Sequence, residues 1–175
     1  MEKTRVVVDF HIYGDKLIPQ LITEKLNITP TRQWLKGDAI TGRGKQPVRD
    51  KKSSSEERPR SPVKLTGKDL KYLELNPHLV RTRTGAVRRF NNWEISTGYE
   101  ESNDINIQLT RIFDLLKNKV SVLNELRDAY NLQFRIDVVV IVENGEKPAM
   151  YFDHWFIDFV HEIEAEVDID LYIYS

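Results

Sequence analysis

The chain reads Ile22-Thr23-Glu24-Lys25-Leu26, then Ile28-Thr29-Pro30-Thr31, then Trp34-Leu35-Lys36-Gly37-Asp38. These seventeen residues hold the end of a short helix, an exit marked by a proline, a large aromatic residue and a Lys-Gly-Asp turn. The helix is predicted to begin at Pro19, because proline suits a first helical turn, and to stop at Asn27. The segment 31–36 is then predicted as a short strand, so the chain opens in the order β-α-β.

The rest of the chain extends this opening into a mixed fold. Alternating or β-branched residues predict strands over residues 5–13, 79–83, 87–97, 134–142, 149–152 and 167–174. Helical spacing predicts helices over residues 67–75, 103–130 and 154–166, the second capped by Ser102 or Asn103 and broken near Asn118. This order predicts an α+β fold, with a mainly antiparallel sheet and helices packed on one face, ferredoxin-like in character.

The segment 39–65 differs in composition from the rest of the chain. It is rich in Ser, Gly, Pro, Lys and Arg, and its few apolar residues have no period. Such a segment cannot bury enough apolar area to offset its conformational entropy. We therefore expect a single α+β domain over residues 1–175 that carries a long, mobile, basic loop insertion at 39–65.

Charge is unevenly distributed along the chain. The formal net charge of −1 is the balance of +1 over residues 1–40, +9 over residues 41–91 and −11 over residues 92–175. Two fields of opposite sign suggest either that these segments dock on each other or that they bind separate partners.

Composition excludes several classes of site. The chain has no cysteine, which excludes disulfides, thiolate metal ligands and a cysteine nucleophile. No apolar run approaches the ~20 residues of a membrane helix, and the first residues are charged rather than signal-like. These features predict a soluble cytoplasmic protein with no membrane partner.

Several short motifs, taken in order, carry a family resemblance. They are Phe10-x-Ile12-x-Gly14, Ile22-Thr23, Leu26-x-Ile28-x-Pro30-Thr31, Trp34-x-Lys36-Gly37-Asp38, Trp93-x-Ile95-Ser96 and the closing Asp168-Ile169-Asp170-Leu171-Tyr172. Together they resemble the bacterial domain-of-unknown-function 4279 family. The resemblance implies a small bacterial α+β domain and supplies no catalytic residues or activity. The segment 43–80 looks longer than the family's usual connection, and nothing carries over to it.

The signature turn of that resemblance has two interpretations. Lys36 could supply charge, and Gly37 could let backbone N–H groups approach a small anion or a peptide. In the structural interpretation, which we favour, Trp34 fills the edge of the core, Gly37 adopts a positive φ and Asp38 bonds to nearby backbone.

The polar face of the predicted sheet is the preferred surface for binding another protein. Its candidate residues are Asp9, His11, Tyr13, Arg135, Asp137, Asp168, Asp170, Tyr172 and Tyr174. Tyrosines among acidic residues suit protein contacts. A cluster of Asp9, His11 and Asp137 could also do acid–base work, although no nucleophile accompanies it.

One helix face presents possible metal ligands. His154, Asp158 and His161 fall within about 60° of each other on the predicted helix and could ligate zinc. We favour a solvated helix face instead, and expect no cofactor.

Three functions follow from these features. The preferred hypothesis is a non-enzymatic protein-interaction domain, in specific form an immunity-type inhibitor that binds a basic toxin through the acidic C-terminal half. The alternatives are a nucleic-acid-binding accessory protein that uses the basic segment 41–91, and a metal-dependent enzyme. The basic segment lacks aromatic residues before Tyr72, and Gly42-Arg43-Gly44-Lys45 does not have the spacing of a phosphate-binding loop.

Overall fold

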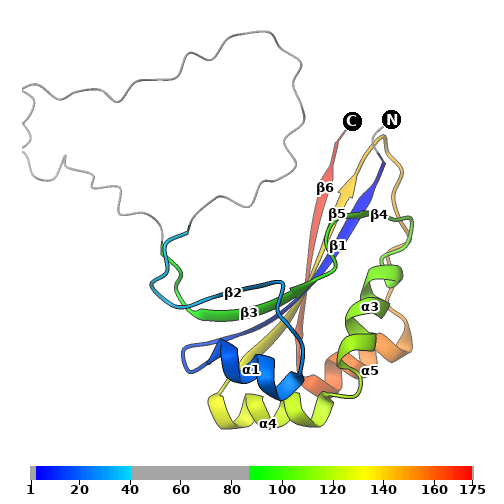
Figure 1. The fold of residues 1–175 in the computed structure, drawn as a ribbon. Helices are drawn as coiled ribbons and strands as arrows, with labels where there is room; N and C mark the ends of the chain where they lie inside the picture. Colours follow the sequence, from blue (N-terminus) through cyan, green and yellow to red (C-terminus); the bar gives the residue numbers. More distant parts are fainter. Residues whose placement is uncertain (1–2, 41–86, 175) are drawn as a thin grey trace, which may run out of the picture. The chain divides into compact units, whose positions relative to one another are not determined.

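The computed structural model describes residues 3–40 and 87–174 (Figure 1). The chain divides into two compact units, one formed by residues 1–38 and 88–175 and the other by residues 39–87. Within the second unit, the described residues show one antiparallel bridge, between Ala39 and Val87. The predicted loop 39–65, helix 67–75 and strand 79–83 lie outside the described residues.

The first unit is built on one sheet. Its strands are β1 (Arg5–Gly14), β2 (Arg32–Trp34), β3 (Asn91–Ser96), β4 (Glu100–Glu101), β5 (Gln133–Val142) and β6 (Glu166–Ile173). The strand order is β2-β3-β1-β5-β6, and the short β4 pairs with β1. Every pairing is antiparallel except that of β5 with β6, which are parallel and joined through a helix.

Helices lie on one face of this sheet (Figure 1). They are α1 (Pro19–Leu26), α3 (Asn106–Leu116), α4 (Val120–Tyr130) and α5 (His154–Ile163). Apolar residues at alternate positions of the central strands meet the helices, among them Phe10 of β1 and Ile136 of β5, which are fully buried. The predicted α+β fold, mainly antiparallel with helices on one face, is confirmed.

Two of the helix ends that were predicted from the sequence are present in the structure. Asn27 ends α1 in the left-handed region, with φ of 51°, and the break near Asn118 separates α3 from α4. The prediction that Ser102 or Asn103 caps α3 was wrong. The side chain that bonds to the start of this helix is that of Asp104, whose Oδ1 accepts a hydrogen bond from the backbone N–H of Asn106 at 2.9 Å.

The predicted strand at 149–152 is also wrong. In that segment only Ala149 bridges to another residue, Asp104. Ala149 donates its N–H to the carbonyl of Asn103 at 2.7 Å, and its own carbonyl accepts from Ile105 at 3.1 Å. These bonds attach the connection between β5 and α5 to the start of α3. The segment is therefore part of the crossover connection from β5 to β6 and not the second strand of a hairpin.

Candidate functional site

The face of the sheet opposite the helices carries polar side chains from neighbouring strands. Asp9 of β1 is paired with Ser96 on one side and Asp137 on the other. Two residues along, His11 is paired with Glu94 and with Arg135. Because directly paired residues point to the same face, the sequence-predicted residues Asp9, His11, Arg135 and Asp137 come together on this open face.

His11 lies at the centre of a charged cluster. Its Nε2 is 3.2 Å from Asp137 Oδ2, and its Nδ1 is 3.7 Å from Glu94 Oε2. Arg135 Nε approaches Asp137 Oδ1 at 2.6 Å, and Arg32 Nε lies 3.8 Å from Glu94 Oε1. The side chains of His11 and Glu94 are only 12% and 3% exposed. We call His11, Glu94, Asp137, Arg135 and Arg32 the His11 cluster.

Burial and charge act in opposite directions on its carboxyl groups. Burial raises the pKa of Glu94, and the nearby His11 and Arg32 oppose that rise only in part. Burial also raises the pKa of Asp9, against a hydrogen bond with Ser96. Burial acts on Asp137 in the same sense, but hydrogen bonds from His11 and Arg135 outweigh it and lower its pKa. Asp137 is thus held as a carboxylate, whereas charge on Glu94 and Asp9 is disfavoured.

The chemistry open to this cluster is limited by its own contacts. Both ring nitrogens of His11 face carboxylates, and the guanidinium of Arg135 is engaged with Asp137. A substrate would have to displace one of these partners before His11 could exchange a proton with it. The geometry fits a cluster that joins strands β1, β3 and β5 by charge.

Two members of the His11 cluster were missed from the sequence. Glu94 and Arg32 are paired with each other across β2 and β3. The sequence does hold a signal for Glu94, because the apolar Trp93 and Ile95 lie on either side of it and alternation in a strand turns Glu94 to the opposite face.

The remaining sequence-predicted residues lie further out on the open face. Asp168 is paired with Asp137, whereas Asp170 is paired with Val139. Tyr172 donates its hydroxyl to Asp170 Oδ2 at 2.6 Å. Tyr13 lies at the C-terminal end of β1, where its ring centre is 5.3 Å from that of Phe90. Tyr174 follows β6 and donates its N–H to the carbonyl of Val142 at 2.9 Å.

The signature turn is structural in part. Gly37 has φ of 93°, and Asp38 Oδ2 accepts the N–H of Leu35 at 2.7 Å, in agreement with the favoured interpretation. The assignment of Trp34 to the core edge is wrong. Trp34 is half-buried on the open face, and the Arg88 guanidinium covers its ring at 3.9 Å from the ring centre. The core tryptophan is Trp93, which is fully buried.

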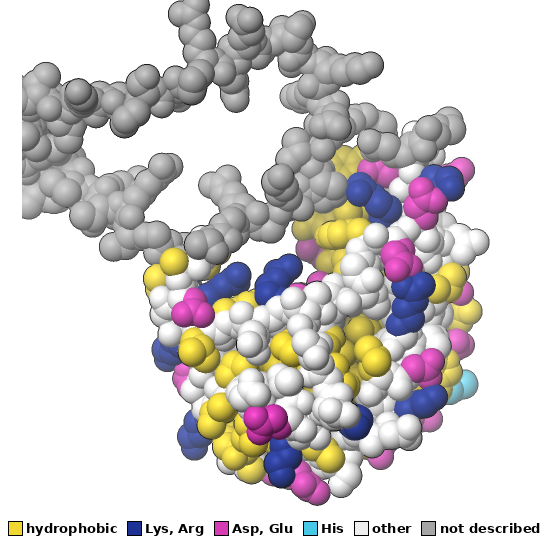
Figure 2. All heavy atoms as spheres, in the orientation of Figure 1, with side chains coloured by type: hydrophobic (Ala, Val, Ile, Leu, Met, Phe, Trp, Pro, Cys, Tyr) yellow, Lys and Arg dark blue, Asp and Glu magenta, His cyan; other side chains and the backbone are white. Residues whose placement is uncertain are grey.

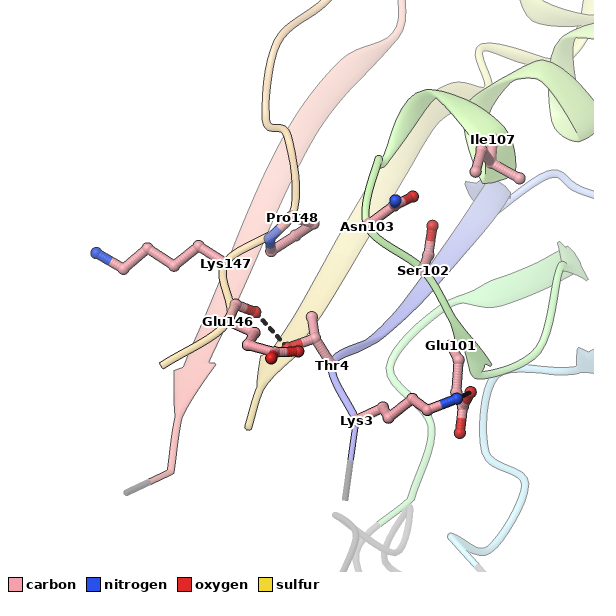
Figure 3. Close-up of a pocket in the computed structure, with 9 residues that line it drawn as sticks. All are labelled: Lys3, Thr4, Glu101, Ser102, Asn103, Ile107, Glu146, Lys147 and Pro148. Carbon is pink, nitrogen blue, oxygen red and sulfur yellow. Dashed lines mark hydrogen bonds and ion pairs between the residues drawn. The ribbon is translucent and has the colours of Figure 1, made fainter. Parts of the chain in front are cut away.

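Two hollows lie away from the His11 cluster. One, of about 470 Å³, lies beside the signature turn and is lined by Leu17, Ile18, Pro19, Gln20, Gln33, Trp34, Leu35 and Asp38. The other, of about 270 Å³, is shown in Figure 3. Its charged side chains include the ion pair of Lys3 with Glu101 at 2.7 Å, and Thr4 donates to the carbonyl of Glu146. Lys147 points away from this hollow (Figure 3).

The helix face with His154, Asp158 and His161 is exposed on α5. Among residues 3–40 and 87–174, no three His, Asp or Glu side chains are grouped as a metal site would require. Within the same residues, no helix is both long enough and apolar enough to cross a membrane.

Comparison with models of known protein families identifies the family of this chain. The family model described as "Domain of unknown function (DUF4279)" matches residues 2–61 and 77–174. The chain belongs to the DUF4279 family. The match omits residues 62–76 of this DUF4279 chain, which fall inside the segment 43–80 expected to exceed the family's usual connection. No curated protein and no solved structure gives a match.

Proposed function

We propose that this DUF4279 chain is a non-enzymatic interaction domain that binds a basic protein through β6. In its specific form the proposal is an immunity-type inhibitor of a basic toxin, acting in the bacterial cytoplasm. The observation that carries it is the acidic row, which we define as Glu166, Asp168 and Asp170. These three residues are exposed at alternate positions of β6.

Charge around the acidic row is one-sided. From Pro148 to Ser175 the sequence has seven Asp or Glu residues and no Lys or Arg. A concentrated negative field speeds the encounter with a basic partner and disfavours acidic ones. The Tyr172 hydroxyl, bonded to Asp170, adds an aromatic side chain of the kind that is enriched in protein interfaces.

The His11 cluster supports the non-enzymatic part of the proposal. Its imidazole and its more buried guanidinium are engaged with carboxylates of the same cluster. Residues 41–91 carry the charge on which the nucleic-acid alternative rests, and the structure describes only residues 87–91 of them. The acidic row therefore has the more specific structural support.

A growth assay tests the proposal. Cells that express the product of the gene adjacent to this one should be inhibited, and co-expression of the chain should restore growth. The double variant Asp168→Asn/Asp170→Asn should lose protection. The matched control, Asp158→Asn/Glu162→Gln, removes the same charge from exposed residues of α5 and should still protect. A harmless neighbouring product, or equal protection by both variants, would overturn the proposal.

A further inference from the structure

Strand β6 offers an open edge. It is the last strand in the order of the sheet, and among the described residues it pairs with β5 alone. Its eight residues form a regular parallel ladder with β5, with no offset in register from Glu166 to Ile173. An edge of this length presents a row of backbone donors and acceptors that can pair with another strand.

The direction of those backbone groups follows from one hydrogen bond. Tyr174 donates its N–H to the carbonyl of Val142, so its backbone faces β5. The N–H and C=O of each residue point to the same side of a strand, and that side alternates along the chain. The backbone groups of Ile169, Leu171 and Ile173 therefore point to the open edge.

The side chains of these three residues are unusually exposed for their type. Ile169, Leu171 and Ile173 are 45%, 44% and 58% exposed, and we call them the apolar row. Val140 of β5, which is paired with Leu171 on the same face, is fully buried. Figure 2 shows hydrophobic side chains over the end of β6 near the C-terminus. Beyond β5, the helix-side face of the sheet thus continues as an apolar strip without full cover.

A second copy of the chain fits this edge poorly. In a two-fold antiparallel pair, each residue of β6 meets a residue of its own row, because the axis keeps the two faces apart. Depending on the register, the acidic row then lies opposite carboxylates or opposite Tyr172 and Tyr174, and in no register does it meet a cation. Like charges directly opposite one another destabilise a strand pair, and the other registers leave the acidic row without a partner of opposite charge.

We propose that β6 accepts an extended segment of a basic partner as an added strand, in which Lys or Arg residues alternate with apolar ones. The cations meet the acidic row, the apolar side chains cover the apolar row, and the backbone completes the edge. This inference rests on the proposed function and specifies how the acidic row is used.

Synthetic peptides provide the probe. An eight-residue peptide of alternating Lys and Val should bind the full chain in a fluorescence titration at low salt. A peptide with the same residues in two blocks, four Lys and then four Val, should bind at least about tenfold more weakly, which corresponds to about 1.4 kcal/mol. The blocked peptide has the same charge, so the difference measures strand register rather than attraction.

N-methylation removes backbone donors without changing the protein. Methylation of the four Val nitrogens blocks an antiparallel strand, because paired residues of that arrangement bond to each other. Methylation of the four Lys nitrogens blocks a parallel strand. One methylated peptide should therefore lose at least about tenfold in affinity while the other binds as the parent does.

A substitution at the edge checks the same contact from the other side. Leu171→Pro removes a donor that points to the open edge and leaves the ladder to β5 intact, a position where edge strands tolerate proline. Binding of the alternating peptide should fall at least about tenfold, whereas Leu171→Val, which keeps the donor, should bind within about threefold of the parent.

The outcomes separate the two proposals. Equal binding of the alternating, blocked and both methylated peptides would overturn strand addition while leaving recognition of a basic partner by charge. Absence of binding by every basic peptide at low salt, together with failure of the growth assay, would overturn both.

Discussion

Replacing His11 by alanine should destabilise the domain, because it removes the imidazole that lies between the carboxylates of Glu94 and Asp137. Asp137 would keep its ion pair with Arg135 at 2.6 Å. Glu94 would keep only Arg32, at 3.8 Å, and the Arg32 side chain is 61% exposed. The charge on Glu94, whose side chain is 3% exposed, would then be buried almost without compensation.

The expected magnitude follows from that burial. Removing the polar partner of a buried group costs about 1–3 kcal/mol. The Glu94 side chain is only 3% exposed, so we expect the upper end, about 3 kcal/mol. For a domain of this size, that loss lowers the melting temperature by about 6–12 °C. In the Glu94→Gln background the uncompensated charge is absent, and His11→Ala should cost about 1 kcal/mol from lost packing.

A double-mutant cycle measures this difference. The four proteins (parent, each single variant and the double variant) are unfolded by urea at pH 7.5 and followed by circular dichroism. A coupling free energy of about 2 kcal/mol between His11 and Glu94 is predicted. A coupling below about 0.5 kcal/mol would refute the assignment of the cluster as a structural junction.

Three further predictions concern stability. Because the pKa of Glu94 is raised by folding, its protonated form contributes to the free energy of unfolding fully below the ordinary value of 4.5, and this contribution is lost as pH rises through the raised pKa. The stability of Glu94→Gln relative to the parent should therefore be greater at pH 7.5 than at pH 4. An equal difference at the two pH values in urea unfolding would contradict this. Trp93→Ala should cost about 3–5 kcal/mol by calorimetry. Thr23→Val removes the acceptor of the Trp93 Nε1 bond at 3.0 Å and the donor of the bond to the Pro19 carbonyl at 3.1 Å, and should cost about 1 kcal/mol. Gly37→Ala should cost about 1 kcal/mol in thermal unfolding from strain at φ of 93°, since a Cβ there meets nothing within 4 Å; an unchanged melting temperature would argue against the strain.

Alternation along single strands was sufficient to predict much of the sheet. In β1 the apolar positions are buried against the helices, and the polar positions Asp9 and His11 face the other side. The same rule brought Asp137 of β5 onto that open face. What alternation could not supply was the burial of Glu94, since that depends on the strands packed beside it and not on its own strand.

The two tryptophans show the same limit. Trp34 and Trp93 are equally apolar in sequence, and each follows a polar residue. The register decides between them, because Trp34 is paired with Asn92 on the open face while Trp93 is paired with Ile12 on the helix side. Register depends on pairing between segments more than 50 residues apart, which local spacing does not encode.

The apolar row of β6 illustrates a third case. Its alternation predicted a strand, and the strand is present. Ile169, Leu171 and Ile173 are exposed nevertheless, because β6 is the edge of the sheet and the face on its helix side is covered only in part. Strand order, rather than residue type, turns this segment into a candidate interface.

The central claim is tested most directly by the rate at which the chain associates with the product of the adjacent gene, which the proposal requires to be a basic protein. Stopped-flow association should slow steeply between low and physiological salt, and Asp168→Asn/Asp170→Asn should slow it by about tenfold at low salt. The control Asp158→Asn/Glu162→Gln should associate within about twofold of the parent. Equal rates for the two double variants would contradict a role for the acidic row of β6.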